Sequence, residues 1–224
     1  ALDLIARSRL LGGGLAAYRV LGLPMSCAME EAEAAAIGAF VQNGGSVIAD
    51  IAPAACDIHG VPWITPPLDA LFGITREGPP RPMTIRRATL DDSAFVLFPD
   101  AAPRVHTDAG IRENGAISRG EGFGDAPSRL WLLREHAQGI TCLLNHTIAP
   151  PKPDAPKEED GRRNALRGLL RQAGCQPVIG QQSTVPFPGF VTRFQYGEAN
   201  IVALLASPEL EGHGIKWPLP FPKG

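Results

Sequence analysis

The chain has 224 residues, 44% of them hydrophobic, and a formal net charge of -2 at pH 7. This is enough apolar material for one substantial core, or one core with a small satellite. The balanced charge and the lack of a basic stripe argue against binding to nucleic acid. No apolar run approaches the roughly 20 residues that a membrane helix requires, so we expect no membrane partner.

A βαβ unit between residues 18 and 60 is the clearest pattern in the chain. Residues 20–23 form a short apolar run, which is typical of a strand buried on both faces, and Pro24 ends it. Residues 29–42 begin with several glutamates and continue with one apolar face, as expected for an amphipathic helix. Two glycines stop that helix before a second buried strand at residues 47–51. The linker is long enough for a crossover helix, so we expect the two strands to be parallel.

The middle of the chain mixes short elements with breaks. Residues 67–72 predict a short helix, and the proline-rich stretch at residues 78–82 marks a possible sub-boundary. Residues 84–90 and 94–98 read as strands. Residues 100–128 are loosely patterned, and no element is predicted there.

The last third contains two predicted hairpins separated by a helix. Residues 130–135 and 140–146 form the first hairpin. Residues 161–173 form a basic amphipathic helix. Residues 190–196 and 201–206 form the second hairpin.

The loops after the two strands of the βαβ unit hold the residues that can carry chemistry, namely Cys27, Asp50, Cys56, Asp57 and His59. The carboxyl ends of neighbouring parallel strands meet at one edge of a sheet, which is where open α/β sheets usually bind ligands. We therefore treat these loops as the candidate site.

Cys27 lies just before the predicted helix, whose dipole favours a thiolate. One hypothesis makes Cys27 or Cys56 a nucleophile with His59 as its base. The alternative makes Cys27 a small buried residue that packs the turn between strand and helix. We favour the alternative, because free cysteine is among the most buried residue types.

Asp57 and His59 alternate in an extended loop, so both side chains are expected on one side. They form either an acid–base pair or a loop-organising pair in which Asp57 caps local amides. Asp50 is either a ligand-binding carboxylate or a cap for the loop that follows it. Cys56 and Asp50 are near enough to join a metal site, but the set matches no known ligand spacing and no C-x-x-C occurs. We predict no metal and no cofactor.

Several stretches resemble one known family. They are LAAYRVLGLP, AFVQNGG, SVIAD, ITCLLNHTIAP, NALRGLLRQAG and VTRFQYGEANIVALLA. Together they are similar to the glutamine-amidotransferase-like domain, or trimerisation domain, of family 42 β-galactosidases, over roughly residues 2–206. The resemblance implies a flavodoxin-like α/β fold of the class I glutamine amidotransferase type, with a parallel-core sheet and added β-hairpins. Residues 207–224 would be a linker towards a C-terminal domain, and the usual first strand and helix would lie before Ala1.

In that family the domain is non-catalytic, and the catalytic glutamates lie in a separate TIM barrel. The resemblance therefore implies a homo-oligomer, a trimer in that family, in contact with other domains of a parent chain. It also implies a role in subunit assembly or in completing the active site of a neighbouring barrel. Nothing in this sequence looks like a TIM barrel, so hydrolysis is not assigned to this chain.

Class I amidotransferases carry their nucleophile in a G-x-C-x-G turn, and this sequence contains none. Cys27 stands instead in P-M-S-C-A-M. The leading hypothesis is thus a non-catalytic domain. The alternatives are a small cysteine-dependent amidotransferase or hydrolase using Cys27 or Cys56 with His59, and a small-molecule sensing module around Asp50. Isolated cysteines and the lack of an apolar signal segment lead us to expect a reducing, cytoplasmic setting.

Overall fold

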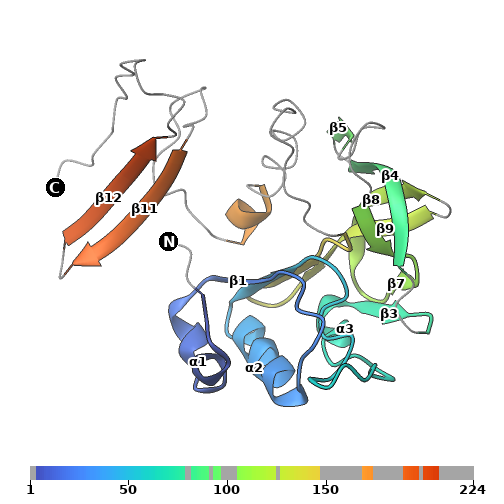
Figure 1. Ribbon diagram of the computed structural model, residues 1–224, viewed down its shortest axis with the longest axis horizontal. Helices are drawn as coiled ribbons and strands as arrows, with labels where there is room; N and C mark the ends of the chain where they lie inside the picture. Colours follow the sequence, from blue (N-terminus) through green and yellow to red (C-terminus); the bar gives the residue numbers. More distant parts are fainter. Residues whose placement is uncertain are drawn as a thin grey trace. The chain divides into compact units, whose positions relative to one another are not determined.

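A computed structural model of the chain gives the fold (Figure 1). The residues it describes are 4–78, 82–90, 93–96, 105–124, 127–146, 168–173, 189–196 and 199–206. The chain forms two compact units, one of Ile5–Cys175 and one of Ala1–Leu4 with Gln176–Gly224. Among the described helices, none has the length and apolar character needed to cross a bilayer. The larger unit contains all the candidate site residues.

The predicted βαβ unit is confirmed. It consists of β1 (Val20–Leu23), α2 (Glu31–Gln42) and β2 (Ser46–Ala49), and the two strands are parallel. A capping box starts the helix: the Glu30 carboxylate accepts from the backbone at Glu33, and the Glu33 carboxylate accepts from the Glu30 amide at 2.9 Å. These bonds satisfy amides that have no partner in the first helical turn.

The main sheet has eight strands in the order β1-β2-β10-β9-β8-β4-β5, with β6 also paired to β4. The strands beyond the βαβ unit are β4 (Pro82–Leu90), β5 (Ser93–Val96), β6 (Val105–Asp108), β8 (Ile117–Gly124), β9 (Pro127–Glu135) and β10 (Ile140–Leu143). β10 is parallel to β2, while β9, β8, β4, β5 and β6 join by antiparallel pairing. The fold is therefore mixed α/β, with a parallel core of three strands extended by antiparallel strands.

Shorter elements surround this sheet. In the larger unit they are α1 (Arg7–Leu11), the 3-10 helix η1 (Gly14–Ala17), α3 (Asp69–Phe72), β3 (Ile74–Arg76), β7 (Ile111–Glu113) and a helical turn at residues 168–172. β3 and β7 pair with each other. In the smaller unit, β11 (Gly189–Tyr196) and β12 (Ala199–Ala206) form an antiparallel hairpin.

Most predicted elements are confirmed, including the short helix before Gly73 and both hairpins. Residues 100–128, whose loose pattern suggested no particular element, contain β6, β7 and β8. Glycines concealed β8: a side chain on Gly122 would lie 2.7 Å from Ser128 Oγ, and one on Gly124 would lie 2.4 Å from the Thr84 carbonyl. The neighbouring strands leave no room for side chains at these two positions, so the alternation of side chains that indicates a strand is missing from the sequence. Of the helix predicted at 161–173 only residues 168–173 are described, and residues 207–224 lie outside the described part.

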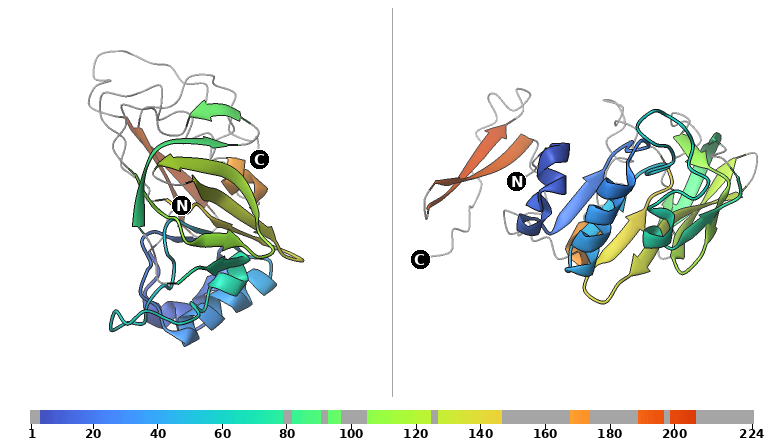
Figure 2. Two further views of the ribbon diagram at one scale, coloured as in Figure 1. Left: turned by 90° about the vertical axis from the view of Figure 1, so that its right-hand side faces the viewer. Right: turned by 90° about the horizontal axis from the view of Figure 1, so that it is seen from below.

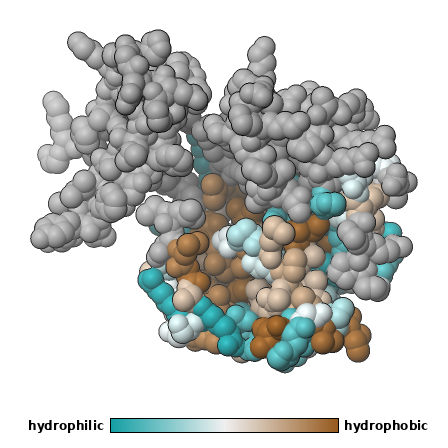
Figure 3. Space-filling view, in the orientation of Figure 1, coloured by the Kyte–Doolittle hydropathy of each residue, from teal (hydrophilic) through white to brown (hydrophobic). Residues whose placement is uncertain are grey.

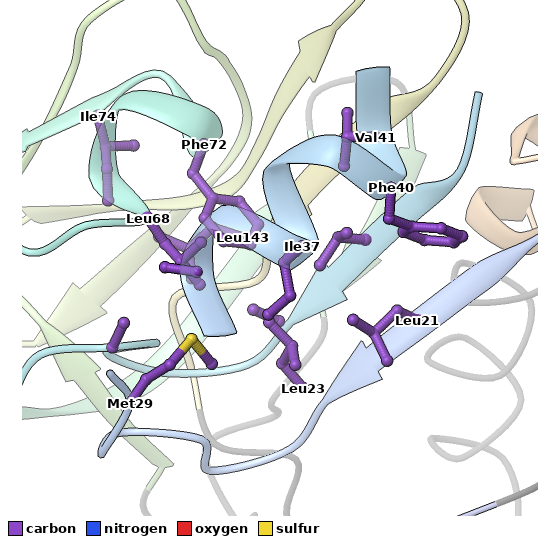
Figure 4. Close-up of a cluster of buried hydrophobic side chains, with 14 of the residues drawn as sticks. Leu21, Leu23, Met29, Ile37, Phe40, Val41, Leu68, Phe72, Ile74 and Leu143 are labelled. Carbon is purple, nitrogen blue, oxygen red and sulfur yellow. The ribbon is translucent and has the colours of Figure 1, made fainter. Parts of the chain in front are cut away.

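Two hydrophobic clusters lie on opposite faces of the sheet. The first packs α2 and α3 against the parallel strands and includes Leu21, Leu23, Ile37, Phe40, Val41, Phe72 and Leu143 (Figure 4). The second includes Ile85, Leu130, Trp131, Cys142, Leu144 and Leu169. Successive residues from Cys142 to Leu144 alternate between the clusters, as the pleat of a strand requires. Figure 2 shows α2 and α3 together on one side of the sheet. β10 is thus buried on both faces, whereas in β1 Leu21 and Leu23 are buried and Gly22 is exposed, so the expectation that residues 20–23 are buried on both faces is wrong.

The turn between α2 and β2, at Gly45, meets the turn between β9 and β10, at Gly139, with no space for a side chain. A Cβ atom on Gly139, before β10, would lie 2.1 Å from the Gly45 carbonyl oxygen. We expect Gly139→Ala to lower the free energy of unfolding by about 2 kcal/mol or more, because backbone must move. Gly38→Ala, in α2 with no atom within 4 Å of the new carbon, serves as the control and should stabilise by about 0.5–1 kcal/mol. Urea unfolding monitored by circular dichroism measures both, and equal effects would contradict the close contact.

Candidate functional site

The candidate site lies where β1, β2 and β10 end at the carboxyl edge of the parallel core. Four residues other than glycine have a positive φ just beyond these strands: Met25 (46°), Ala52 (46°), Ala54 (52°) and Asn145 (54°). Backbone in this region is costly for residues with a side chain and persists only where its surroundings hold it. The contacts that hold this edge therefore decide what it can do.

Asp50 ties the ends of β1 and β2 together. Its side chain is buried, and Oδ1 accepts hydrogen bonds from the Met25 amide at 2.7 Å and the Ile51 amide at 2.6 Å. The first bond reaches across to the loop after β1 and fixes Met25 in its left-handed conformation. This geometry matches the capping role among the two predicted for Asp50.

Cys27 lies beside Asp50 and Cys56, which the sequence predicted to share this edge. Its Sγ is 3.8 Å from the Ile51 carbonyl oxygen. Burial raises the pKa of the Cys27 thiol, and the charges of Asp50 and Cys56 raise it further, while Arg76 opposes the shift. This is the opposite of what a nucleophilic cysteine needs. The start of α2 is occupied instead by the Glu30–Glu33 capping box.

Cys56 is held by backbone pairing. Its amide donates to the Cys27 carbonyl at 3.0 Å, its Sγ lies 3.4 Å from the same oxygen, and its carbonyl accepts from the Met29 amide at 3.0 Å. The loop after β2 thus runs beside the loop after β1 as a short two-stranded contact. Cys142 is fully buried, and burial raises the pKa of its thiol.

Asp57 organises the loop that contains His59. Its Oδ1 accepts from the backbone amides of His59 and Val61, each at 2.9 Å. The His59 ring is exposed, and in the part of the chain that the structure describes no hydrogen bond joins this ring to Cys27 or Cys56. The geometry is that of the loop-organising alternative, and a catalytic role for this pair stays a prediction.

A buried ionic group next to this edge was missed by sequence reasoning. The Arg76 guanidinium contacts both Asp69 oxygens at 3.0 Å and Asp108 Oδ2 at 3.1 Å, and all three side chains are less than 10% exposed. Burial raises the pKa of Asp69, and its hydrogen bonds to Arg76 oppose that shift. The three residues come from α3, β3 and β6, so no spacing along the chain reveals the group.

Asn145 links this ionic group to the end of β10. Its Nδ2 donates to the carbonyls of Asp108 at 3.0 Å and Arg129 at 2.7 Å, and its Oδ1 accepts from the Asp108 amide at 3.2 Å. Its own carbonyl accepts from the Thr107 hydroxyl at 2.5 Å. The side chain is fully buried, and these bonds commit it to joining β10, β9 and β6.

His146 is the next residue along, and its ring is also engaged. The Trp131 indole Nε1 donates to His146 Nε2 at 3.1 Å, and the rings stack at 6.3 Å between centroids. An indole nitrogen can only donate, so Nε2 must be unprotonated in this arrangement. Within the described residues no group of three or more His, Cys, Asp or Glu could hold a metal ion. The edge is therefore a network of structural hydrogen bonds in which the Cys27 thiol is not activated.

Comparison with known proteins finds similar folds but no similar sequence. No protein-family model and no curated protein matches the chain. Its structure is similar to the E323A catalytic mutant of Gan42B, a GH42 β-galactosidase from G. stearothermophilus, with a TM-score of 0.60 and 16% identity over 84% of this chain. The β-galactosidases from Rahnella sp. R3 (TM-score 0.60, 16% identity) and from Bacillus circulans sp. alkalophilus (TM-score 0.60, 14% identity) each also match over 84% of this chain.

The chain spans about a quarter of the length of these structures, 26% or 27%. At such identities the likeness concerns the fold alone. The chain therefore has the fold of a part of GH42 β-galactosidases.

The environment of Cys27 predicts slow alkylation at neutral pH. Because its pKa is raised, its rate should still be rising where an ordinary thiol, with a pKa of about 8.5, has levelled off. Asp50→Asn keeps the acceptor oxygen but removes the charge, so it should lower the Cys27 pKa and speed alkylation at a given pH. Asp57→Asn, which removes a carboxylate that does not contribute to the Cys27 shift, is the matched control. Peptide mapping measures the alkylation rate of Cys27 in each variant as a function of pH. A Cys27 pKa below that of a free thiol would support the nucleophile hypothesis.

The buried ionic group predicts a large difference between two arginines. Arg76→Met leaves two buried carboxylates without their cation and should cost about 3–5 kcal/mol of unfolding free energy. Arg112→Met removes an exposed pair with Glu77, 2.8 Å in length, and should cost less than about 1 kcal/mol. Denaturant titration of both variants measures the contrast. Comparable losses would mean that Arg76 does not hold the two aspartates as described.

Proposed function

We propose that this chain is a non-catalytic, amidotransferase-like domain of a larger β-galactosidase-like protein, serving subunit assembly or the completion of a neighbouring active site. The observation that carries the proposal is the shared fold: it covers 84% of this chain but only about a quarter of the GH42 β-galactosidases it matches. Most of each of those proteins thus has no counterpart here. We therefore infer that this chain acts within a larger assembly.

The chemistry of the strand ends supports a non-catalytic role. A cysteine nucleophile needs a lowered pKa or an imidazole within hydrogen-bond reach. Cys27 has a raised pKa, and its described contact is a backbone carbonyl. Asp50, Asp57 and Asn145 all bind backbone amides or carbonyls that shape the loops. These polar groups stabilise the edge rather than act on a substrate.

The partners we propose are other copies of the chain, forming a homo-oligomer, and the other domains of a parent protein. In the domain that the sequence resembles, the assembly is a trimer. Hydrolysis of a galactoside would belong to another part of the parent protein, and this chain would contribute a surface and not a reacting group.

Sedimentation equilibrium combined with two activity assays tests the proposal. We expect the isolated chain to associate as its concentration rises, to release no ammonia from glutamine, and to cleave no nitrophenyl galactoside. Cys27→Ala should leave association unchanged. A monomeric chain whose glutaminase activity disappears in Cys27→Ala would overturn the proposal in favour of an enzyme.

A further inference from the structure

The chain contains two asparagine–glycine pairs, and both asparagines are exposed. One pair is Asn43–Gly44, at the end of α2, and the other is Asn114–Gly115, in the turn between β7 and β8. Asparagine is a chemically labile residue, because the backbone nitrogen of the next residue can attack its side-chain amide. A glycine in the next position leaves that approach open, since it has no Cβ atom. The two pairs are equivalent in sequence, and the structure separates them.

The pair Asn43–Gly44 is held by the end of α2. Asn43 is the C-cap residue, and its amide donates to the Ala39 carbonyl at 3.0 Å. The Gly44 amide donates to the Val41 carbonyl at 3.0 Å. The proton of the Gly44 amide must leave before the nitrogen can attack, and this hydrogen bond retains it. The capped helix end therefore protects Asn43.

The pair Asn114–Gly115 is held on both sides but not at the nitrogen that would react. The Gly73 carbonyl accepts from the Asn114 amide at 2.7 Å and from the Ala116 amide at 3.0 Å. Among the hydrogen bonds of the described residues, none uses the Gly115 amide or the Asn114 side chain. Gly115 is exposed, with a φ of 97°, and hydrophilic residues reach the surface on the side of the unit that carries β3 and β7 (Figures 1 and 3). Both reacting groups are thus open to water.

We propose that Asn114 is a modification site, at which the folded chain converts asparagine to aspartate and isoaspartate. The Gly115 nitrogen loses its proton and bonds Asn114 Cγ. The bond from Cγ to the side-chain nitrogen breaks, and this nitrogen leaves with the proton as ammonia. One water molecule then opens the cyclic imide at either of its two carbonyls, which gives aspartate or isoaspartate. Water is the co-reactant, and nothing is oxidised or reduced.

The position of Asn114 gives the modification a structural consequence. Isoaspartate adds one carbon to the main chain between the Asn114 and Ala116 amides, which both bind the Gly73 carbonyl. Either product also places a new negative charge next to Glu113, which pairs with β3. Because β3 also carries Arg76, the modified turn holds the buried ionic group less firmly. The inference does not depend on the function proposed above.

Ageing of the folded chain at mildly alkaline pH, followed by peptide mapping with mass spectrometry, tests the inference. Asn114 should be converted at least about tenfold faster than Asn43, because reaction at Asn43 first requires the hydrogen bond of the Gly44 amide to break. In urea, where both pairs are unfolded, the two rates should become similar. Asn114→Gln should remove most of the ammonia that the folded chain releases. Asn43→Gln is the matched control and should leave that release unchanged.

Three results would overturn the inference. Equal conversion in the folded chain, or faster conversion at Asn43, would mean that the helix end does not protect Asn43. The same ratio of rates in urea as in the folded chain would assign the difference to the neighbouring sequence and not to the structure. An unreactive Asn114 in the folded chain, over a time in which both asparagines react in urea, would show that the turn protects it. Each result leaves the proposed function untouched, since that rests on the shared fold.

Discussion

The sharing of one buried guanidinium by two carboxylates is the constraint on which the strand ends of this fold depend. Arg76 joins Asp69 of α3 to Asp108 of β6, and Asn145 continues the link from Asp108 to the end of β10. Buried charges are costly unless they are paired and hydrogen-bonded, so each of these groups requires the others. The antiparallel strands are thereby fixed to the parallel core at the edge where an α/β protein would otherwise place a ligand.

Hydrogen bonds between polar groups also join the ends of β1 and β2. Asp50 uses one oxygen to hold two amides, and the loops after both strands pair through Cys27, Cys56 and Met29. The positive φ angle at Met25 occurs where its amide binds Asp50, and Ala54, which also has a positive φ, donates its amide to the Ser26 carbonyl at 2.9 Å. The polar groups of these loops are thus committed to bonds between the two strand ends.

The βαβ unit could be predicted because its information is local: an apolar run, a capping box and two glycines lie in order along the chain. The co-location of Cys27, Asp50 and Cys56 could be predicted too, because parallel strands bring their carboxyl ends together. β8 could not be predicted, because Gly122 and Gly124 lack the side chains whose alternation indicates a strand. The reason for these glycines is the close approach of β4 and β9, which the sequence does not reveal. The direction of the Cys27 pKa shift depends on burial, and the Arg76 group depends on three separate elements. Neither the pKa shift nor the ionic group can be read from a short segment of the sequence.

The contact between the turn before β2 and the turn before β10 bears on how such a domain diverges. Gly139 meets the Gly45 carbonyl, and a side chain on Gly45 would in turn lie 2.3 Å from the Phe40 ring. A side chain on Gly139 would require the backbone around it to move, and one on Gly45 would require the Phe40 ring to move. The structural neighbours retain the fold at only 14% to 16% identity. Among distantly related proteins with this fold, we therefore expect these two glycines to be conserved more strongly than the cysteines.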